Sequence, residues 1–429
     1  MPDLARLSAR EAAQRIAAGS LTSEALVRSC LERIGEREAV VGAWEHLVPE
    51  QALAEARARD REPRRGALHG VPIGVKDIMD TADLPTHYGS RAYAGHRPGA
   101  DAACVALARR AGAVVLGKTV STEFAAMSPG KTRNPHDPAR TPGGSSSGSA
   151  AAVADHMVPL AFGTQTAGSI VRPASFCGVV GYKPSFGIVA IAGTKTLAHS
   201  LDTIGGLARD VRDVALFIAA LTDRPALVPD DLPAEPRLGL YRTPPFDQAE
   251  PATLAALEQA ASRLSRAGIA VTERGAFAAF GELVAVQDTV MLYESARNLA
   301  WEYQNRAAAI TLATQQMLEN GFDIAGAAYE AARAKAATAR ARIAEFFGDL
   351  DAVLVPAARG EAPVGTATGD PVFNRAWTLL HLPCVTLPGA RGPAGMPVGV
   401  QIVGRPGEDA RLLAVACRIE AALGSGNSS

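Results

Sequence analysis

Two serine-containing stretches and one lysine supply the residue types needed for nucleophilic catalysis. The first stretch is 143–149 (GGSSSGS), the second is 163–170 (GTQTAGSI), and Lys76 follows the short apolar run 71–75. Together they offer a nucleophilic hydroxyl, a second hydroxyl and an amine base. The Ser-His-Asp triad has Ser-Lys variants in which other residues take the same roles. The combination therefore predicts a hydrolase that works without histidine.

The second stretch has the composition of an oxyanion hole. Its small residues allow a tight turn in which several backbone N–H groups converge on one point. Thr166, Ala167, Gly168 and Ser169 are the candidate donors, and Ser169 would attack a carbonyl from the start of a helix. A plain strand-to-helix turn explains the same pattern, and on its own the motif favours that structural explanation.

Lys76 lies between the apolar residues Val75 and Ile78. Burial would lower its pKa from the usual value of about 10.4 and leave a neutral amine available as a general base. In isolation, however, an ion pair with Asp77 or an amine that reaches solvent is the better explanation of this lysine.

Three other motif matches are rejected on their context. Residues 112–119 fit the P-loop pattern, but the variable positions Ala-Val-Val-Leu favour a strand interior over a phosphate-binding turn. Residues 144–148 fit the GxSxG elbow, but that elbow must follow a strand and here follows a loop. Residues 128–131 fit SxxK, but Pro-Gly between the two side chains disfavours the helix that would align them.

Taken together, the Lys76-Asp77 pair, the GGSS loop and the G-S-I turn resemble the amidase signature family. The 24 residues that separate Ser145 from Ser169 match the spacing of that family. The resemblance covers most of the chain, since further segments look like family segments; they are 68–73, 111–119, 177–184 and 396–401.

The resemblance implies roles for three residues. Ser169 would be the acyl nucleophile, Ser145 the relay serine with a cis peptide bond to Gly144, and Lys76 the base. It also implies an α/β fold with a central twisted mixed β-sheet surrounded by α-helices. We expect a small-molecule amide as substrate, no cofactor and no metal.

The chain departs from the family pattern D-x-G-G-S-I-R at two charged positions. The acid is Gln165 and the arginine is Val171, with Arg172 one place later. Because both charges are absent together, we expect a neutral contact in place of an ion pair. Ser147 also stands where glycine is usual.

The rest of the chain predicts one domain over 1–429. Residues 1–66 would form an N-terminal helical layer, with a capping box at Ser8. Residues 225–350 would be mostly helical and shape the substrate entrance, and 424–429 would be a flexible tail. Apolar runs that predict buried strands occur at 70–75, 113–116, 179–182, 352–355 and 398–403, and a final helix is expected at 409–423.

Composition limits the partners. The 429 residues carry a formal net charge of −1, which favours neither nucleic acid nor an anionic membrane. The five cysteines form no CxxC motif, and neither a signal peptide nor a membrane span is recognisable, so we expect a cytoplasmic protein. The oligomeric state stays open.

Three functions fit the sequence. The first is a hydrolase of linear amides, with aryl amides, anilides or carbamates as candidate substrates. The second is the transferase component of a tRNA-dependent amidotransferase. The third is a catalytically inactive family member, against which the presence of Lys76, Ser145 and Ser169 argues.

Overall fold

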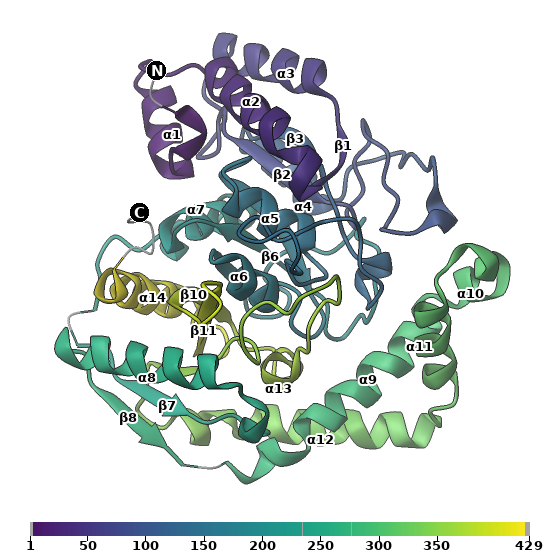
Figure 1. Cartoon of the computed structure of the whole chain (residues 1–429), viewed down its shortest axis with the longest axis vertical. Coiled ribbons are helices and arrows are strands. Elements are labelled where there is room, and N and C mark those ends of the chain that lie inside the picture. Colours follow the sequence, from purple (N-terminus) through teal and green to yellow (C-terminus); the bar gives the residue numbers. More distant parts are fainter. Residues whose placement is uncertain (1–2, 234, 276, 425–429) are drawn as a thin grey trace.

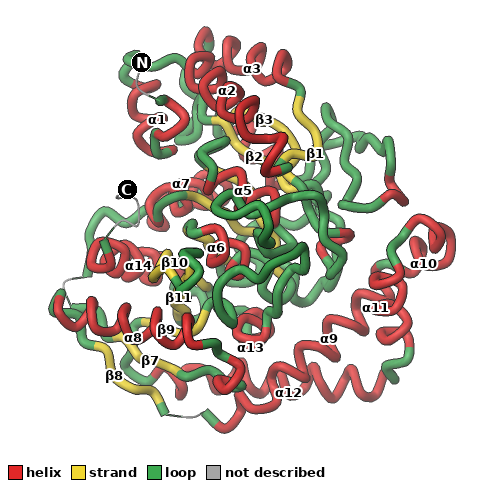
Figure 2. Tube along the Cα trace, viewed as in Figure 1, coloured by secondary structure: helices red, strands yellow, loops and turns green. Residues whose placement is uncertain are grey.

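The computed structural model describes residues 3–233, 235–275 and 277–424. A single mixed sheet of eleven strands runs through the molecule, in the order β1-β3-β2-β4-β6-β5-β10-β11-β9-β7-β8. Helices surround it, as Figures 1 and 2 show. The strands are β1 (Trp44–Leu47), β2 (Pro72–Lys76), β3 (Val114–Thr119), β4 (Leu160–Gln165), β5 (Val180–Lys183), β6 (Thr203–Ala208), β7 (Leu238–Tyr241), β8 (Val271–Arg274), β9 (Ala352–Pro356), β10 (Cys384–Arg391) and β11 (Pro397–Gly404).

The described residues form fourteen α-helices. They are α1 (Ala9–Ala17), α2 (Ser23–Val41), α3 (Pro49–Arg61), α4 (Ala103–Arg110), α5 (Ser147–Ala154), α6 (Val171–Cys177), α7 (Val211–Thr222), α8 (Pro251–Arg266), α9 (Leu283–Asn298), α10 (Ala300–Arg306), α11 (Leu312–Phe322), α12 (Gly326–Phe347), α13 (Val372–Leu379) and α14 (Asp409–Leu423). The predicted final helix has the bounds of α14, and each predicted strand overlaps an observed one.

Both faces of the sheet are buried. Along β9, Ala352 and Leu354 pack into one hydrophobic cluster, while Val353 and Val355 pack into another. This alternation follows from the two-residue period of a strand, which sends successive side chains to opposite faces. Helices α4, α7, α8 and α14 share the first cluster, and α9, α12 and α13 share the second. Continuous apolar strands are therefore the sequence pattern that this sheet requires.

The N-terminal layer begins as the sequence predicts but is not wholly helical. Ser8 accepts a hydrogen bond from the N–H of Glu11 at 3.1 Å, and Thr22 caps α2 through the N–H of Ala25 at 3.1 Å. Residues 1–66, predicted as a helical layer, also contain the strand β1, which pairs antiparallel with β3 and forms one edge of the sheet. The pattern of β1 is too short to stand out from its helical surroundings.

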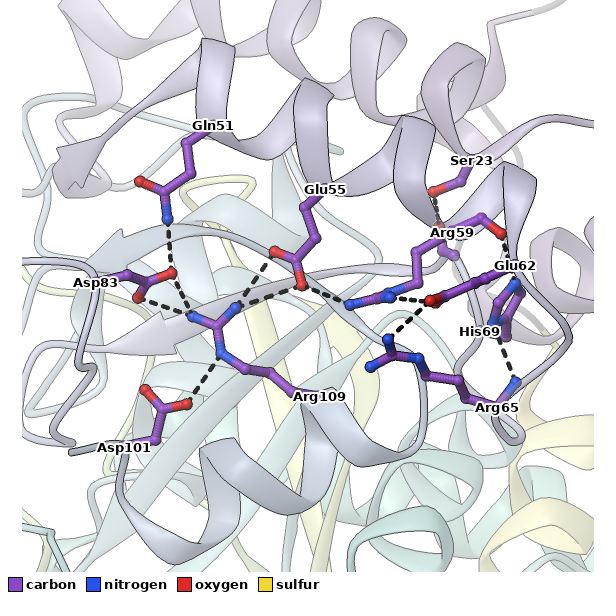
Figure 3. A network of polar contacts seen from close by, with 11 residues as sticks. Ser23, Gln51, Glu55, Arg59, Glu62, Arg65, His69, Asp83, Asp101 and Arg109 are labelled. Atoms are coloured by element: carbon purple, nitrogen blue, oxygen red, sulfur yellow. Dashed lines mark hydrogen bonds and ion pairs between the residues drawn. The ribbon is translucent and has the colours of Figure 1, made fainter.

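Ion pairs attach this layer to the sheet domain. Arg109 of α4 contacts Glu55 of α3 at 3.3 Å, Asp83 at 2.8 Å and Asp101 at 3.1 Å (Figure 3). Glu55 also pairs with Arg59 at 3.1 Å within α3. Because a guanidinium has five N–H donors, one arginine can bind carboxylates from three segments at once.

The region 225–350 contains strands as well as helices. β7 and β8 pair in parallel and extend the far edge of the sheet, and α8 packs on β10 and β11. Only α9 to α12 project from the sheet as a helical arm (Figure 1). The role of this arm in shaping a substrate entrance stays a prediction, as does the division of the chain into one domain.

The five cysteines, Cys30, Cys104, Cys177, Cys384 and Cys417, are buried and free. No helix among the described residues is long and apolar enough to cross a membrane. The predicted tail lies outside the described residues except for Gly424.

Candidate active site

Lys76 is the last residue of β2, and its side chain is fully buried. Its neighbours Ile73 and Val75 face one hydrophobic cluster, so the two-residue period of the strand turns Lys76 to the other face. There Lys76 Nζ lies 2.7 Å from Ser145 Oγ and 2.7 Å from Thr164 Oγ1. Burial lowers the pKa of this amine well below its usual value. An amine with a lowered pKa, whose hydrogen-bond partners among the described residues are two hydroxyl groups, therefore lies where the sequence predicts the base.

Ser145 precedes α5 and is fully buried. The peptide bond between Gly144 and Ser145 is cis, as the family resemblance implies. The Ser145 carbonyl accepts a hydrogen bond from the N–H of Thr122 at 3.3 Å, which fixes this loop against the segment after β3.

Ser169 lies between β4 and α6, in the predicted turn. Its carbonyl accepts a hydrogen bond from the N–H of Ser146 at 3.3 Å, which brings the two serine stretches together. No hydrogen bond within the described part of the chain joins the Ser145 and Ser169 hydroxyl groups. The structure thus brings Lys76 and Ser145 into contact and places Ser169 against the residue that follows Ser145.

Hydrogen bonds hold three carbonyls of the turn 166–169. Gln287 of α9 donates to the Thr166 carbonyl at 3.0 Å, Thr378 donates to the Ala167 carbonyl at 2.7 Å, and the N–H of Arg172 donates to the Gly168 carbonyl at 2.9 Å. Within the described residues, no hydrogen bond uses the N–H groups of positions 166–169. Converging unbonded amides are the arrangement that stabilises an oxyanion.

Gln165 takes a neutral role at the base of this turn. Its Oε1 accepts hydrogen bonds from the N–H groups of Ile170 at 2.9 Å and Val171 at 3.0 Å, and its Nε2 donates to Thr378 at 3.0 Å. It therefore caps the first turn of α6 and holds α13. These contacts agree with the expected neutral replacement of an ion pair.

Arg172 lies behind the loop of Ser145. It is buried, and its Nη2 donates to the carbonyl of Gly144 at 2.6 Å. Its Nε and Nη1 have no hydrogen-bond partner, and burial lowers its pKa to about 9. The sequence marks this arginine only as displaced by one place from the family position.

A family model described as Amidase matches residues 25–413. The chain belongs to the amidase signature family. Among its curated relatives is one of the subunits of glutamyl-tRNA(Gln) amidotransferase from Anaeromyxobacter sp. (strain K), which is 34% identical over 98% of this chain and 97% of its own length.

Solved structures of the amidase signature family agree with this fold. One described as an amidase has a TM-score of 0.91 and 32% identity, covering 97% of this chain and 100% of that chain. The native peptide amidase from Stenotrophomonas maltophilia has a TM-score of 0.82 and 31% identity, covering 97% of this chain and 96% of that chain. The predicted mixed sheet surrounded by helices is therefore confirmed.

The ion pair proposed as an alternative for Lys76 is not formed. Asp77 pairs with Lys118 at 3.3 Å and accepts the N–H of His87 at 3.1 Å. Lys118 is the lysine of the rejected P-loop pattern; it lies in β3 and also donates to the carbonyl of Met79 at 2.6 Å. The amine of Lys76 is thus left without a carboxylate within 4.0 Å among the described residues.

The other rejected motifs also lie in structures that do not suit them. The stretch before Ser146 is loop, not strand, and residues 128–131 are not helical. Ser128 instead bonds Thr311 at the start of α11, at 2.5 Å. Each chance match is therefore explained by its local backbone.

Three contributors to this site carry no signal in the sequence. Asp202, Gln287 and Thr378 come from three segments that the fold brings around the two serine stretches. Their residue types are common and their spacing is irregular, so only the topology selects them.

One cluster outside the site has residue types that bind metals: Glu45, His46 and His87. His87 Nε2 accepts a hydrogen bond from the N–H of Gly95 at 3.2 Å, so the proton of the neutral ring is on Nδ1. That atom faces His46 Nε2 at 3.3 Å and Glu45 at 3.5 Å. The two histidines are thus in hydrogen-bond contact with Glu45 beside them, and the absence of a metal stays a prediction.

Proposed function

We propose that this chain cleaves an amide C–N bond through an acyl-enzyme on Ser169. Ser145 relays the proton and Lys76 accepts it, while the N–H groups of Thr166, Ala167, Gly168 and Ser169 hold the oxyanion. The observation that carries the proposal is the buried amine of Lys76, bonded to Ser145 at 2.7 Å and to no carboxylate among the described residues. A lysine in that state has the protonation needed in a base near neutral pH.

The proposed reaction has two halves. Ser169 Oγ attacks the amide carbon, its proton passes to Ser145, and the Ser145 proton passes to Lys76. When the C–N bond breaks, the proton returns by the same path to the leaving nitrogen. An acceptor, which is water in a hydrolase, then attacks the acyl-enzyme. The Ser145 and Ser169 hydroxyl groups are not hydrogen-bonded in this structure. The proposed proton transfer requires that they form this bond when substrate is present, and catalytic hydrogen bonds often tighten on substrate binding.

The comparisons favour the transferase alternative over the stand-alone hydrolase. Curated relatives at 32–35% identity over nearly the whole chain are subunits of glutamyl-tRNA(Gln) amidotransferases. We therefore place first the amide-cleaving component of a complex that amidates glutamyl-tRNA(Gln). In that case we expect the complex to bind tRNA, while the surface of this chain itself is still expected not to bind nucleic acid.

A stand-alone hydrolase of small-molecule amides is the second candidate. The likeness to the peptide amidase from Stenotrophomonas maltophilia, at 31% identity, supports it. Anilides and carbamates as substrates, and a cytoplasmic location, stay predictions.

One experiment tests the proposed chemistry and separates the two candidates. The purified chain is incubated with glutamine, a peptide amide, an anilide, a carbamate and an ester, and released ammonia or amine is measured. In parallel, a fluorophosphonate probe is applied and the adduct is located by mass spectrometry. We expect an adduct on Ser169 that Ser169→Ala abolishes and Ser146→Ala keeps. An adduct on Ser146 would overturn the proposal. Turnover of an amide other than glutamine by the isolated chain favours the hydrolase.

A further inference from the structure

Asp202 is a buried acid next to the predicted oxyanion turn. It precedes β6, and Thr166 follows β4; because Gln165 pairs with Thr203 in the antiparallel ladder, the two residues face each other beyond its end. Asp202 Oδ1 accepts the Thr166 hydroxyl at 2.5 Å. Its Oδ2 accepts the N–H groups of Leu197 at 2.8 Å and Ala198 at 3.1 Å.

These contacts fix the carboxylate rigidly. The segment that carries Leu197 is tied to α9, since Asn298 donates to the Leu197 carbonyl at 3.1 Å and Ser200 donates to Glu294 at 2.6 Å. All the donors to Asp202 are neutral. No lysine, arginine or histidine nitrogen among the described residues lies within 4.0 Å of it. Burying a carboxylate without a nearby cation costs folding free energy. Its presence here therefore points to a role other than packing the turn.

Lys76 is the group whose positive charge this carboxylate can stabilise. β2, β4 and β6 are neighbours in the sheet, so the end of β2 and the start of β6 lie on either side of the end of β4. Lys76 bonds Thr164 of β4, two residues before Thr166. Asp202 is the one charge that raises the pKa of Lys76 against the effect of burial.

The other charged groups near the two residues have different partners. Asp77, beside Lys76 in the chain, is turned to Lys118. Glu294 on α9 accepts hydrogen bonds from Ser200 and Tyr329. Burial, with Glu294 adding to it, raises the pKa of Asp202 to about 6, so the group is ionised at neutral pH.

We propose that Asp202 is a positioning residue of the amide-cleaving reaction, which orients Thr166 and stabilises the ammonium that Lys76 becomes during attack. The inference rests on the proposed function. As Ser169 Oγ bonds to the carbonyl carbon, its proton reaches Lys76 through Ser145, and the carbonyl electron pair moves to oxygen. Lys76 then carries a positive charge, and the fixed negative charge of Asp202 lowers the free energy of that state. Asp202 keeps its own protonation throughout.

The test uses the second-order rate of fluorophosphonate labelling as a function of pH, which needs no known substrate. Neutralising Asp202 lowers the pKa of Lys76, so in Asp202→Asn the acid limb of the profile moves to lower pH, by about one unit. The plateau rate falls about ten- to a hundredfold, because the ammonium is less stabilised. Thr166→Val removes one donor to Asp202 and raises the pKa of that carboxyl without removing it, so it lowers the rate and moves the limb less than Asp202→Asn does.

Controls keep the result decisive. Asp202→Ser replaces Asp202→Asn if circular dichroism shows that the latter does not fold, and Asp202→Glu retains the charge and keeps the limb in place. This inference is overturned if the acid limb of the labelling profile does not move in Asp202→Asn or Asp202→Ser. It is also overturned if the limb moves as far in Thr166→Val as in those two variants. In both cases Ser169→Ala still abolishes labelling, so the proposed function stands. Labelling that survives in Ser169→Ala overturns the proposed function itself.

Discussion

Lys76 Nζ lies 2.7 Å from Ser145 Oγ, although 69 residues separate the two in the chain. The amine is buried and has hydroxyl groups as its only side-chain partners among the described residues. Asp77, its neighbour in sequence, pairs with a different lysine. The proposed base and the proposed relay hydroxyl are thus brought together by the sheet and the start of α5.

Replacing Lys76 by methionine should change the pH dependence of stability. The native pKa of Lys76 lies below the unfolded value of 10.5, so between these values the unfolded chain binds a proton that the native chain does not. Wild-type stability therefore rises with pH relative to Lys76→Met, by up to about 1.4 kcal/mol per pH unit. The amine's contribution is lost as pH falls through its native pKa. Urea unfolding at pH 7 to 10 measures this difference.

Lys335 provides the matched control, because its side chain is 59% exposed. Lys335→Met should give a stability difference that stays level over the same pH range. A level difference for Lys76→Met as well would mean that Lys76 is charged in the native state.

Ser145→Ala should reduce labelling of Ser169 by about a hundred- to ten-thousandfold, because the proton path to Lys76 is broken. Ser147 is the control two residues later. Its hydroxyl donates to the Val120 carbonyl at 3.3 Å, away from the amine. Ser147→Ala should keep the labelling rate within about threefold, since it removes only one ordinary hydrogen bond. Equal rates in the two variants would exclude a relay role for Ser145.

Gln165→Asp should destabilise the chain by about 2 kcal/mol and slow labelling. The shorter side chain cannot reach both Ile170 and Thr378, and it places a charge in a buried site. The exposed Gln316 offers a control, since Gln316→Asp meets only solvent and Asn320. Denaturant unfolding compares the two variants, and a gain of stability and activity in Gln165→Asp would contradict the neutral role of Gln165.

Arg109→Met should cost about 2 kcal/mol of unfolding free energy, because three partly buried carboxylates lose their shared cation. The pair Arg15–Glu11 is exposed on both sides. Arg15→Met should therefore cost less than about 0.5 kcal/mol. The rate of Ser169 labelling should stay unchanged in both variants. A lower labelling rate in Arg109→Met alone would contradict this and show that the ion-pair network affects the site.

The site was predictable where local sequence sets the local backbone. Small residues at 166–169 favour a tight turn directly after β4. Burial of the strand that carries Lys76 was predictable, because a continuous apolar strand in this kind of sheet has no solvent-facing side. The family resemblance was needed to prefer a buried base over an ion pair with Asp77 or an amine that reaches solvent. The same reasoning rejected the P-loop match, since Ala-Val-Val-Leu forms the interior of β3.

The partners of these residues were decided by tertiary structure alone. Whether Lys76 or Lys118 pairs with Asp77 depends on the register of β2 against β3, which no spacing in the chain reveals. Asp202 reaches Thr166 only because β4 and β6 are antiparallel neighbours. Gln287 and Thr378 arrive from helices more than a hundred residues away. By itself the sequence determined which apolar runs are buried strands and where the chain turns, because these follow from local periodicity and composition. Contacts between distant segments, and with them the electrostatics of the site, follow from strand order and helix packing.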